Sequence, residues 1–164
     1  MSNEETDFAE FFRASWEPCL RAVVAVVGRP QMAEDQVAEA FARAWASWRK
    51  VSRHPAPRAW VVRTALNTGA SWWRRRRELP LADRDVAAPG DLGDGLDATL
   101  LTALWRLPPR QREVIALRIF LDLDTDIIAG QLGIEAGTVR MHMSRGVAAL
   151  RRELTTTKTM EAGQ

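Results

Sequence analysis

Arginines and polar side chains share one side of the segment Ala136–Leu154, whose spacing is that of a helix. That side carries Arg140, Met141, Ser144 and Arg145, and Arg151 and Arg152 follow further along. The other side is apolar, with a repeat at intervals of three and four made by Val139, Met143, Val147, Leu150 and Leu154. A helix held by one face, with arginines on its free face, suits the major groove of DNA.

The residues just before this segment predict the first half of a helix-turn-helix. Thr125–Leu132 has the spacing of a short helix, and Ile128 and Ala129 lie on its inner face. Gly133–Ile134 then predicts a tight turn, because glycine takes the positive φ that ends a helix at little cost. An ordinary helical hairpin whose arginines only keep it soluble remains the alternative for this segment alone.

A second group of residues suited to nucleic acid is the run Trp72–Arg77, WWRRRR. Indole rings stack on bases and arginines neutralise phosphates, so the run resembles a platform for a single strand. Two adjacent indoles cannot both face one helix core, which favours exposure of at least one. The alternative is a pair of indoles in internal contacts beside a solvated charge run.

The remaining composition excludes several function classes. The 164 residues hold 23 basic and 21 acidic side chains, and the single cysteine, Cys19, cannot form an internal disulfide. No nucleophile–base pair, phosphate-binding glycine loop or Cys/His metal set is evident, so we expect neither an enzyme nor a cofactor. The acidic start Met1–Asp7 is unlike a signal peptide, and no apolar run reaches the roughly 20 residues of a membrane span, so we expect a cytoplasmic chain without membrane insertion.

Helical spacing predicts the elements that position these residues in the N-terminal half. We expect helices over Phe8–Val27, Gln31–Trp48 and Arg58–Arg77, with a loop at Val51–Arg58. Pro18 predicts a kink or a break in the first helix. Asn67–Gly69 predicts a bend in the third, because these residues are poor helix formers. Together these helices form a predicted domain over 8–78.

The composition changes sharply after this domain. Residues 79–97 contain two prolines, three glycines and five aspartates against a single arginine, and predict a flexible acidic linker. Short helices follow at Ala98–Leu107 and Arg110–Phe120, and with the helix-turn-helix they form a second domain over 98–154. Residues 155–164 predict a disordered tail. The predicted fold class is therefore all-α, with two small helical domains joined by a flexible linker.

At this point the C-terminal half resembles a known family. Leu107–Val114 (LPPRQREV), Leu117–Arg118 and Asp122–Arg140 (DLDTDIIAGQLGIEAGTVR) resemble region 4, the second promoter-binding domain of bacterial sigma factors. Three residues depart from the family pattern near the recognition helix. Glu135 stands where serine often caps the helix and is a poorer cap, and Met141 and His142 stand where serine and arginine are frequent.

The N-terminal half resembles region 2 of the same family. Ala33–Asp35, Glu39–Phe41 and Arg43–Trp45 are similar to its core-binding helix, although Ala38 replaces the usual glutamine. Pro57–Trp60, Asn67 and the arginine run resemble the segment that melts and reads the minus-ten element. Two such halves around an acidic linker resemble the small extracytoplasmic-function group of sigma-70 factors.

The resemblance implies a promoter-specific transcription initiation factor that binds core RNA polymerase and promoter DNA. It implies docking on the polymerase clamp by Glu34, Asp35, Glu39 and Arg43. It implies that the opened minus-ten strand is held by Asn67, Trp72, Trp73, Arg74, Arg75 and Arg76, together with the loop around Arg53–Arg58. It implies that the minus-thirty-five duplex is read by Thr138, Arg140, Met141, Ser144 and Arg145. The polymerase flap and an anti-sigma factor are further partners that the resemblance allows.

Two other classes remain open from the residues alone. A stand-alone repressor would use the same helix-turn-helix, but it would dimerise and bind a palindrome without polymerase. An adaptor that does not bind DNA would use its helices only for protein contacts. Transcription by core polymerase with and without the chain separates all three classes.

Overall fold

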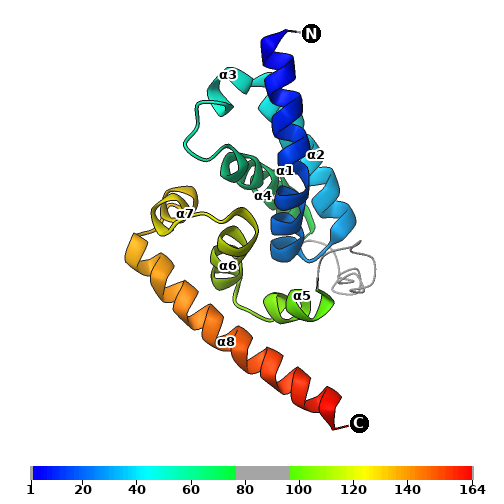
Figure 1. Ribbon diagram of the computed structural model, residues 1–164, viewed down its shortest axis with the longest axis vertical. Helices are drawn as coiled ribbons and strands as arrows, with labels where there is room; N and C mark the ends of the chain where they lie inside the picture. Colours follow the sequence, from blue (N-terminus) through cyan, green and yellow to red (C-terminus); the bar gives the residue numbers. More distant parts are fainter. Residues whose placement is uncertain (1, 77–96, 164) are drawn as a thin grey trace. The chain divides into compact units, whose positions relative to one another are not determined.

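The computed structural model describes residues 2–76 and 97–163, with side chains described in 2–69 and 97–163 (Figure 1). Every element in these ranges is a helix, which confirms the all-α prediction. The chain divides into two compact units, Met1–Ala87 and Ala88–Gln164. The predicted linker at 79–97 lies outside the described residues except for Asp97, so its flexibility stays a prediction.

The first helix, α1 (Asn3–Val27), begins five residues before the predicted start at Phe8. Its N-terminus is a capping box, in which Ser2 Oγ accepts from the Glu5 amide at 3.2 Å and Glu5 Oε2 accepts from the Ser2 amide at 2.8 Å. Gly28 ends the helix with φ 74°, a conformation that favours glycine. The local signal for the early start, a serine followed three residues later by glutamate, is present in the sequence.

The predicted break at Pro18 is wrong, because α1 continues through this residue as one helix, whereas a kink there stays a prediction. Proline lacks the N–H that would bond to the carbonyl of Ala14, four residues earlier. That carbonyl accepts instead from Nη2 of Arg58 at 2.8 Å. A side chain from another part of the unit thus replaces the donor that proline removes.

Three more helices complete the first unit, and their bounds differ from the predicted ones. The predicted helix Gln31–Trp48 is two helices, α2 (Pro30–Ala46) and α3 (Trp48–Val51), which meet at Ser47. The last helix, α4 (Pro57–Arg76), starts at a proline, which suits a first helical position. It passes through Asn67–Gly69 as one helix, so α4 is not divided there, and a bend at these residues stays a prediction.

The close approach of α2 and α4 explains the glycine in the middle of α4. A Cβ built on Gly69 would lie 2.5 Å from Nε2 of Gln36, a side chain of α2 that is 6% exposed. Gly69 therefore leaves the space that the Gln36 side chain occupies. Tertiary packing outweighs the low helix propensity of glycine here.

The core of the first unit lies where α1, α2 and α4 pack on one another. Its fully buried side chains include Cys19, Val23, Val37, Val61 and Val62. Rings from α1, α2 and α3 also contact one another, tilted or edge-to-face, at centroid distances of 5.0 to 6.4 Å; they are Phe8, Phe11, Phe12, Trp16, Phe41, Trp45 and Trp48. This aromatic cluster joins α1 to α2 and α3.

The second unit contains α5 (Ala98–Trp105), α6 (Pro109–Leu121), α7 (Thr125–Leu132) and α8 (Ala136–Ala162). The long α8 packs against the other three, with Leu101, Leu104, Ile115, Ile128 and Val139 in the core. Arg112 of α6 closes the end of α5 by donating to the carbonyls of Leu104, Trp105 and Leu107 at 2.8 to 3.1 Å. Burial lowers the pKa of Arg112, and the neighbouring Glu113 opposes that shift.

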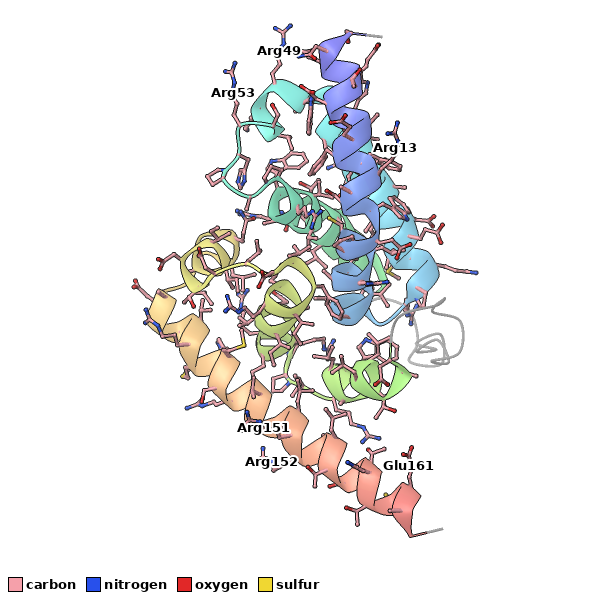
Figure 2. All side chains as sticks on the ribbon, viewed as in Figure 1. Arg13, Arg49, Arg53, Arg151, Arg152 and Glu161 are labelled. Atoms are coloured by element: carbon pink, nitrogen blue, oxygen red, sulfur yellow. The ribbon has the colours of Figure 1, made fainter. Side chains whose placement is uncertain are left out.

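The predicted disordered tail is wrong for most of its length, because α8 continues to Ala162. Threonines in the last turns donate their hydroxyls to carbonyls four residues earlier, as Thr155 does to Arg151 and Thr159 to Thr155. An ion pair of 2.7 Å between Arg106 and Glu153 also ties α8 to the end of α5. Figure 2 shows Arg151 and Arg152 projecting from the middle of this helix and Glu161 near its end.

Candidate nucleic-acid interface

The second unit contains the predicted helix-turn-helix, formed by α7 and the first half of α8. Asp124 caps α7 by accepting from the Ile127 amide at 2.9 Å, and Gly133 ends it with φ 65°. Before α7, Asp122 has φ 50°, and Arg118 donates to the Leu123 carbonyl at 2.8 Å. These bonds fix the start of α7 and the connection before it, while α7 packs against α8 with Ile128 and Val139 buried.

The outward face of α8 carries the side chains predicted to read the duplex. Arg140, Met141, Ser144 and Arg145 are exposed, and Thr138 is partly exposed. Met141 is 38% exposed, which is high for a large apolar side chain. Among the residues of the second unit that the structure describes, neither Arg140 nor Arg145 forms an ion pair. Both guanidinium groups are thus available to phosphate or guanine.

Two polar atoms on the inner side of this motif are buried without a hydrogen-bond partner among the described residues. They are Oε1 of Gln131, on α7, and Nδ1 of His142, on α8. His142 is therefore turned partly inward, unlike Arg140 and Arg145. Glu135 is the N-cap of α8 and makes no side-chain capping bond, as expected from its replacement of serine.

In the first unit, α2 and α4 form an open groove of about 410 Å³. It is lined by Arg43, Ala46, Ser47, Trp60, Thr64 and Asn67. Asn67 is exposed, so its amide can both donate and accept, and Trp60 offers part of an indole ring. The Thr64 hydroxyl donates to the Trp60 carbonyl at 2.8 Å and keeps its acceptor capacity. The groove therefore combines an aromatic wall with polar groups that can bond a base edge.

Arg43 lies on the surface predicted for it and on a second surface as well. It was grouped with Glu34, Asp35 and Glu39 on a surface for polymerase docking, and all four are exposed on α2. The structure also places Arg43 in the groove with Asn67. Its Nε donates to Oε1 of Glu39 at 3.1 Å, so Arg43 connects the acidic surface with the groove.

The loop around Arg53–Arg58 divides into two parts. Arg53 is exposed and points outward, as does Arg49 at the end of α3 (Figure 2). Arg58 instead packs against α1, where Nε donates to Ser15 Oγ at 3.0 Å and Nη2 to the Ala14 carbonyl. Arg58 thus makes structural contacts, and its contact with a nucleic-acid strand stays a prediction.

The remaining predicted strand contacts lie on the last turns of α4. The backbone of Trp72, Trp73, Arg74, Arg75 and Arg76 is helical. The structure does not describe the side chains of these residues, and Arg77 lies outside the described residues. Their roles therefore stay predictions.

Sequence reasoning did not single out Ala46, Ser47 or Thr64 as groove residues, and it named Trp60 only as the end of the segment Pro57–Trp60. Trp60, Thr64 and Asn67 follow one another at intervals of four and three, so they share one face of α4. That spacing could have identified half of the groove. The other half comes from α2, across a tertiary contact.

The lone thiol of Cys19 is not poised for chemistry. Burial raises its pKa to about 12, against the opposing effect of Arg58, and its Sγ donates to the Arg58 carbonyl at 3.8 Å. No group of His, Cys, Asp and Glu side chains in the described residues could hold a metal ion. None of the described helices is long and apolar enough to cross a membrane.

Both units match family models, and the chain is similar to known proteins over most of its length. The family model for sigma-70 region 2 matches residues 15–78, and the model for sigma-70 region 4 matches residues 97–150. RNA polymerase sigma-E factor of Streptomyces coelicolor is 32% identical, over 92% of this chain and 88% of that protein. ECF RNA polymerase sigma factor SigW of Bacillus subtilis is 28% identical, over 79% of each chain.

A solved structure shares the fold. It is that of the sigma factor RpoE of Bartonella quintana, crystallised in complex with the anti-sigma factor NepR. The TM-score is 0.78 at 22% identity, with coverage of 91% of this chain and 97% of that one.

Proposed function

Because this chain belongs to the extracytoplasmic-function group of sigma-70 factors, and so directs transcription initiation, we propose that its two units divide promoter recognition between them. The first unit docks on core RNA polymerase and holds the opened minus-ten strand. The second reads the minus-thirty-five element as duplex. The groove between α2 and α4 is the observation that carries this proposal.

The groove suits a base that has left the duplex. Unpairing and unstacking a base costs a few kcal/mol, and a pocket must offset that cost with stacking and hydrogen bonds. Trp60 provides an aromatic surface at one side of the groove, and Asn67 provides an amide that can distinguish base edges. Arg43 adds a positive charge beside them for the strand's phosphates.

The reading face of α8 suits an intact duplex. Arg140 and Arg145 can each make paired hydrogen bonds to guanine or to a phosphate, and Thr138 and Ser144 can bond either. Met141 can contact the methyl group of thymine. With Met141 and the inward-turned His142 at these positions, the bases read would differ from those of relatives with serine and arginine there.

The exposed acidic face of α2 suits a basic surface on the polymerase clamp. Glu34, Asp35 and Glu39 lie on it, and Ala38 and Ala42 leave room for a partner helix between them. An anti-sigma factor that covers this face or the reading face of α8 would silence the chain. Exposed charges of this kind favour fast, salt-dependent association.

The decisive experiment is transcription by core polymerase with and without the chain, with sequencing of the transcript starts. We expect starts downstream of one shared pair of elements, and potassium permanganate reactivity of thymines in the minus-ten element. Binding of the chain alone to a palindrome, with no effect on the polymerase, would instead indicate a repressor. Co-purification with polymerase without any DNA contact would indicate an adaptor.

A further inference from the structure

One ion pair of the first unit belongs to two surfaces at once. Glu39 lies on the exposed acidic face of α2, and Arg43, one turn later, lines the groove with Asn67. The distance from Arg43 Nε to Glu39 Oε1 is 3.1 Å. A residue of the acidic face is therefore bonded directly to a residue that lines the groove.

We propose that Glu39 restrains Arg43 in the free protein, and that docking of the acidic face on the polymerase releases Arg43 for a phosphate of the opened strand. This inference rests on the proposed function, because it takes the groove as the strand site and the acidic face as the docking site. Glu39 is then a positioning residue that makes strand binding depend on polymerase binding.

The restraint is electrostatic. A guanidinium bonded to a carboxylate has most of its charge neutralised locally, and a phosphate that approaches it meets the negative charge of Glu39. The order along the helix, glutamate four residues before arginine, is the favourable one for such a pair. A basic group of the polymerase that binds Glu39 would remove the competing carboxylate without moving Arg43 out of the groove.

The size of the effect follows from exposure. The side chains of Arg43 and Glu39 are 56% and 51% exposed, so solvent and salt screen their attraction. Exposed pairs of this kind shift a competing equilibrium by about twofold. The restraint is thus weak enough to be released on docking, yet measurable in the free chain.

The test measures the affinity of the full chain for a fluorescein-labelled pool of random single-stranded DNA, by anisotropy at about 50 mM salt, where screening is weak. A random pool is suitable because a phosphate contact carries no sequence information. The test variant is Glu39→Gln. The matched control is Glu17→Gln, which removes one carboxylate from another exposed pair four residues apart, Glu17 and Arg21 on α1, 3.8 Å from each other.

We expect Glu39→Gln to bind the strand about twofold more tightly than Glu17→Gln does, because only Glu39→Gln releases Arg43. Both variants change the net charge equally, so the difference between them does not come from net charge. The salt dependence should also steepen, by part of the roughly 0.7 unit that one full phosphate contact adds on a single strand. In an Arg43→Gln background, Glu39→Gln and Glu17→Gln should change the affinity for the strand equally, because there is no Arg43 left to release. Weaker binding by Glu39→Gln would overturn the inference, since Glu39 would then aid Arg43.

The same measurements separate this inference from the proposed function. If Arg43→Gln and Asn67→Ala both leave strand affinity unchanged, the groove does not hold the strand and both ideas fail. If these two variants weaken binding while Glu39→Gln behaves like Glu17→Gln, the groove stands and only the restraint by Glu39 is overturned.

Discussion

Arg58 donates a 2.8 Å hydrogen bond to the carbonyl of Ala14, the acceptor that Pro18 leaves without a helical donor. The same guanidinium donates to Ser15 Oγ, so the first turn of α4 is fastened to the middle of α1. The backbone bond that Pro18 removes from α1 is thus replaced by a bond from α4. The bond joins the Ala14 carbonyl, in the middle of α1, to the start of α4.

Replacing Arg58 by alanine should lower the free energy of unfolding of the first unit by about 1–2 kcal/mol, because a charge-assisted bond to a part-buried hydroxyl and a bond to a carbonyl are lost. Urea denaturation followed by circular dichroism measures this. In a Pro18→Ala background α1 regains its own donor, and the same substitution should cost less. Equal costs in the two backgrounds would show that Arg58 does not substitute for the missing N–H.

Asn67→Ala should slow promoter opening and leave polymerase binding and duplex affinity nearly intact, because the amide acts only on an extruded base. Permanganate reactivity of the minus-ten thymines measures opening. A template with a premelted bubble should restore part of the transcription, since the unpairing cost is removed while base reading stays impaired. Full opening by the variant on duplex templates would exclude Asn67 as the strand selector.

Arg140→Ala and Arg145→Ala should each weaken binding to a minus-thirty-five duplex. Loss of a phosphate contact should lower the salt slope by about one unit, whereas loss of a base contact should relax preference at one position by about 1–3 kcal/mol. Titrations at several salt concentrations, against the preferred duplex and single-base variants of it, distinguish the two. Lys158→Ala, on the last turns of α8, is the matched control for lost charge. Unchanged affinity and preference in both arginine variants would place the reading face elsewhere.

Glu39→Lys should weaken binding to core polymerase without changing the helical content, because it reverses a charge on the acidic face of α2. Co-purification with core polymerase, or competition with another sigma factor, measures the loss. Glu10→Lys, an equal charge change at an exposed position of α1, is the control. If both variants bind as the unchanged chain does, the acidic face lies outside the interface.

Gly146→Ala should destabilise the second unit by about 1–3 kcal/mol, because its Cβ would lie 2.3 Å from Cδ1 of the buried Ile115. Thermal unfolding measures the loss, and Ile115→Val, which removes that Cδ1, should reduce the cost of the glycine change. Gly130 of α7 is the control, because a Cβ there meets nothing within 4 Å and Gly130→Ala should stabilise by about 0.5–1 kcal/mol. Equal changes in stability at Gly146 and Gly130 would show that the Ile115 side chain moves aside at no cost.

The sequence predicted the elements well where local signals decide them. The turn at Gly133, the start of α8 after Glu135 and the exposed face of Arg140 and Arg145 all follow from spacing and glycine conformation. The capping box at Ser2 and Glu5 was equally readable, although the helix was expected to start only at Phe8.

The errors arose where distant residues decide the outcome. Pro18 was expected to interrupt α1, but Arg58, forty residues later, supplies the missing donor. Residues 155–164 were expected to be disordered because they have no apolar pattern, but α8 continues to Ala162 and the Arg106–Glu153 ion pair ties this helix to the end of α5. The groove joins Arg43 of α2 to Asn67 of α4, and only the packing of the two helices brings them together.

The contact of Gly69 with Gln36 also bears on how this chain can change by mutation. The two positions share one volume, so a methyl group at 69 fits only after the side chain at 36 has moved or become smaller. The amide of Gln36 has no hydrogen-bond partner among the described residues, so a smaller residue at 36 forfeits no bond to them. Substitutions in this pair therefore have a preferred order in descent, with position 36 changing before the glycine is lost.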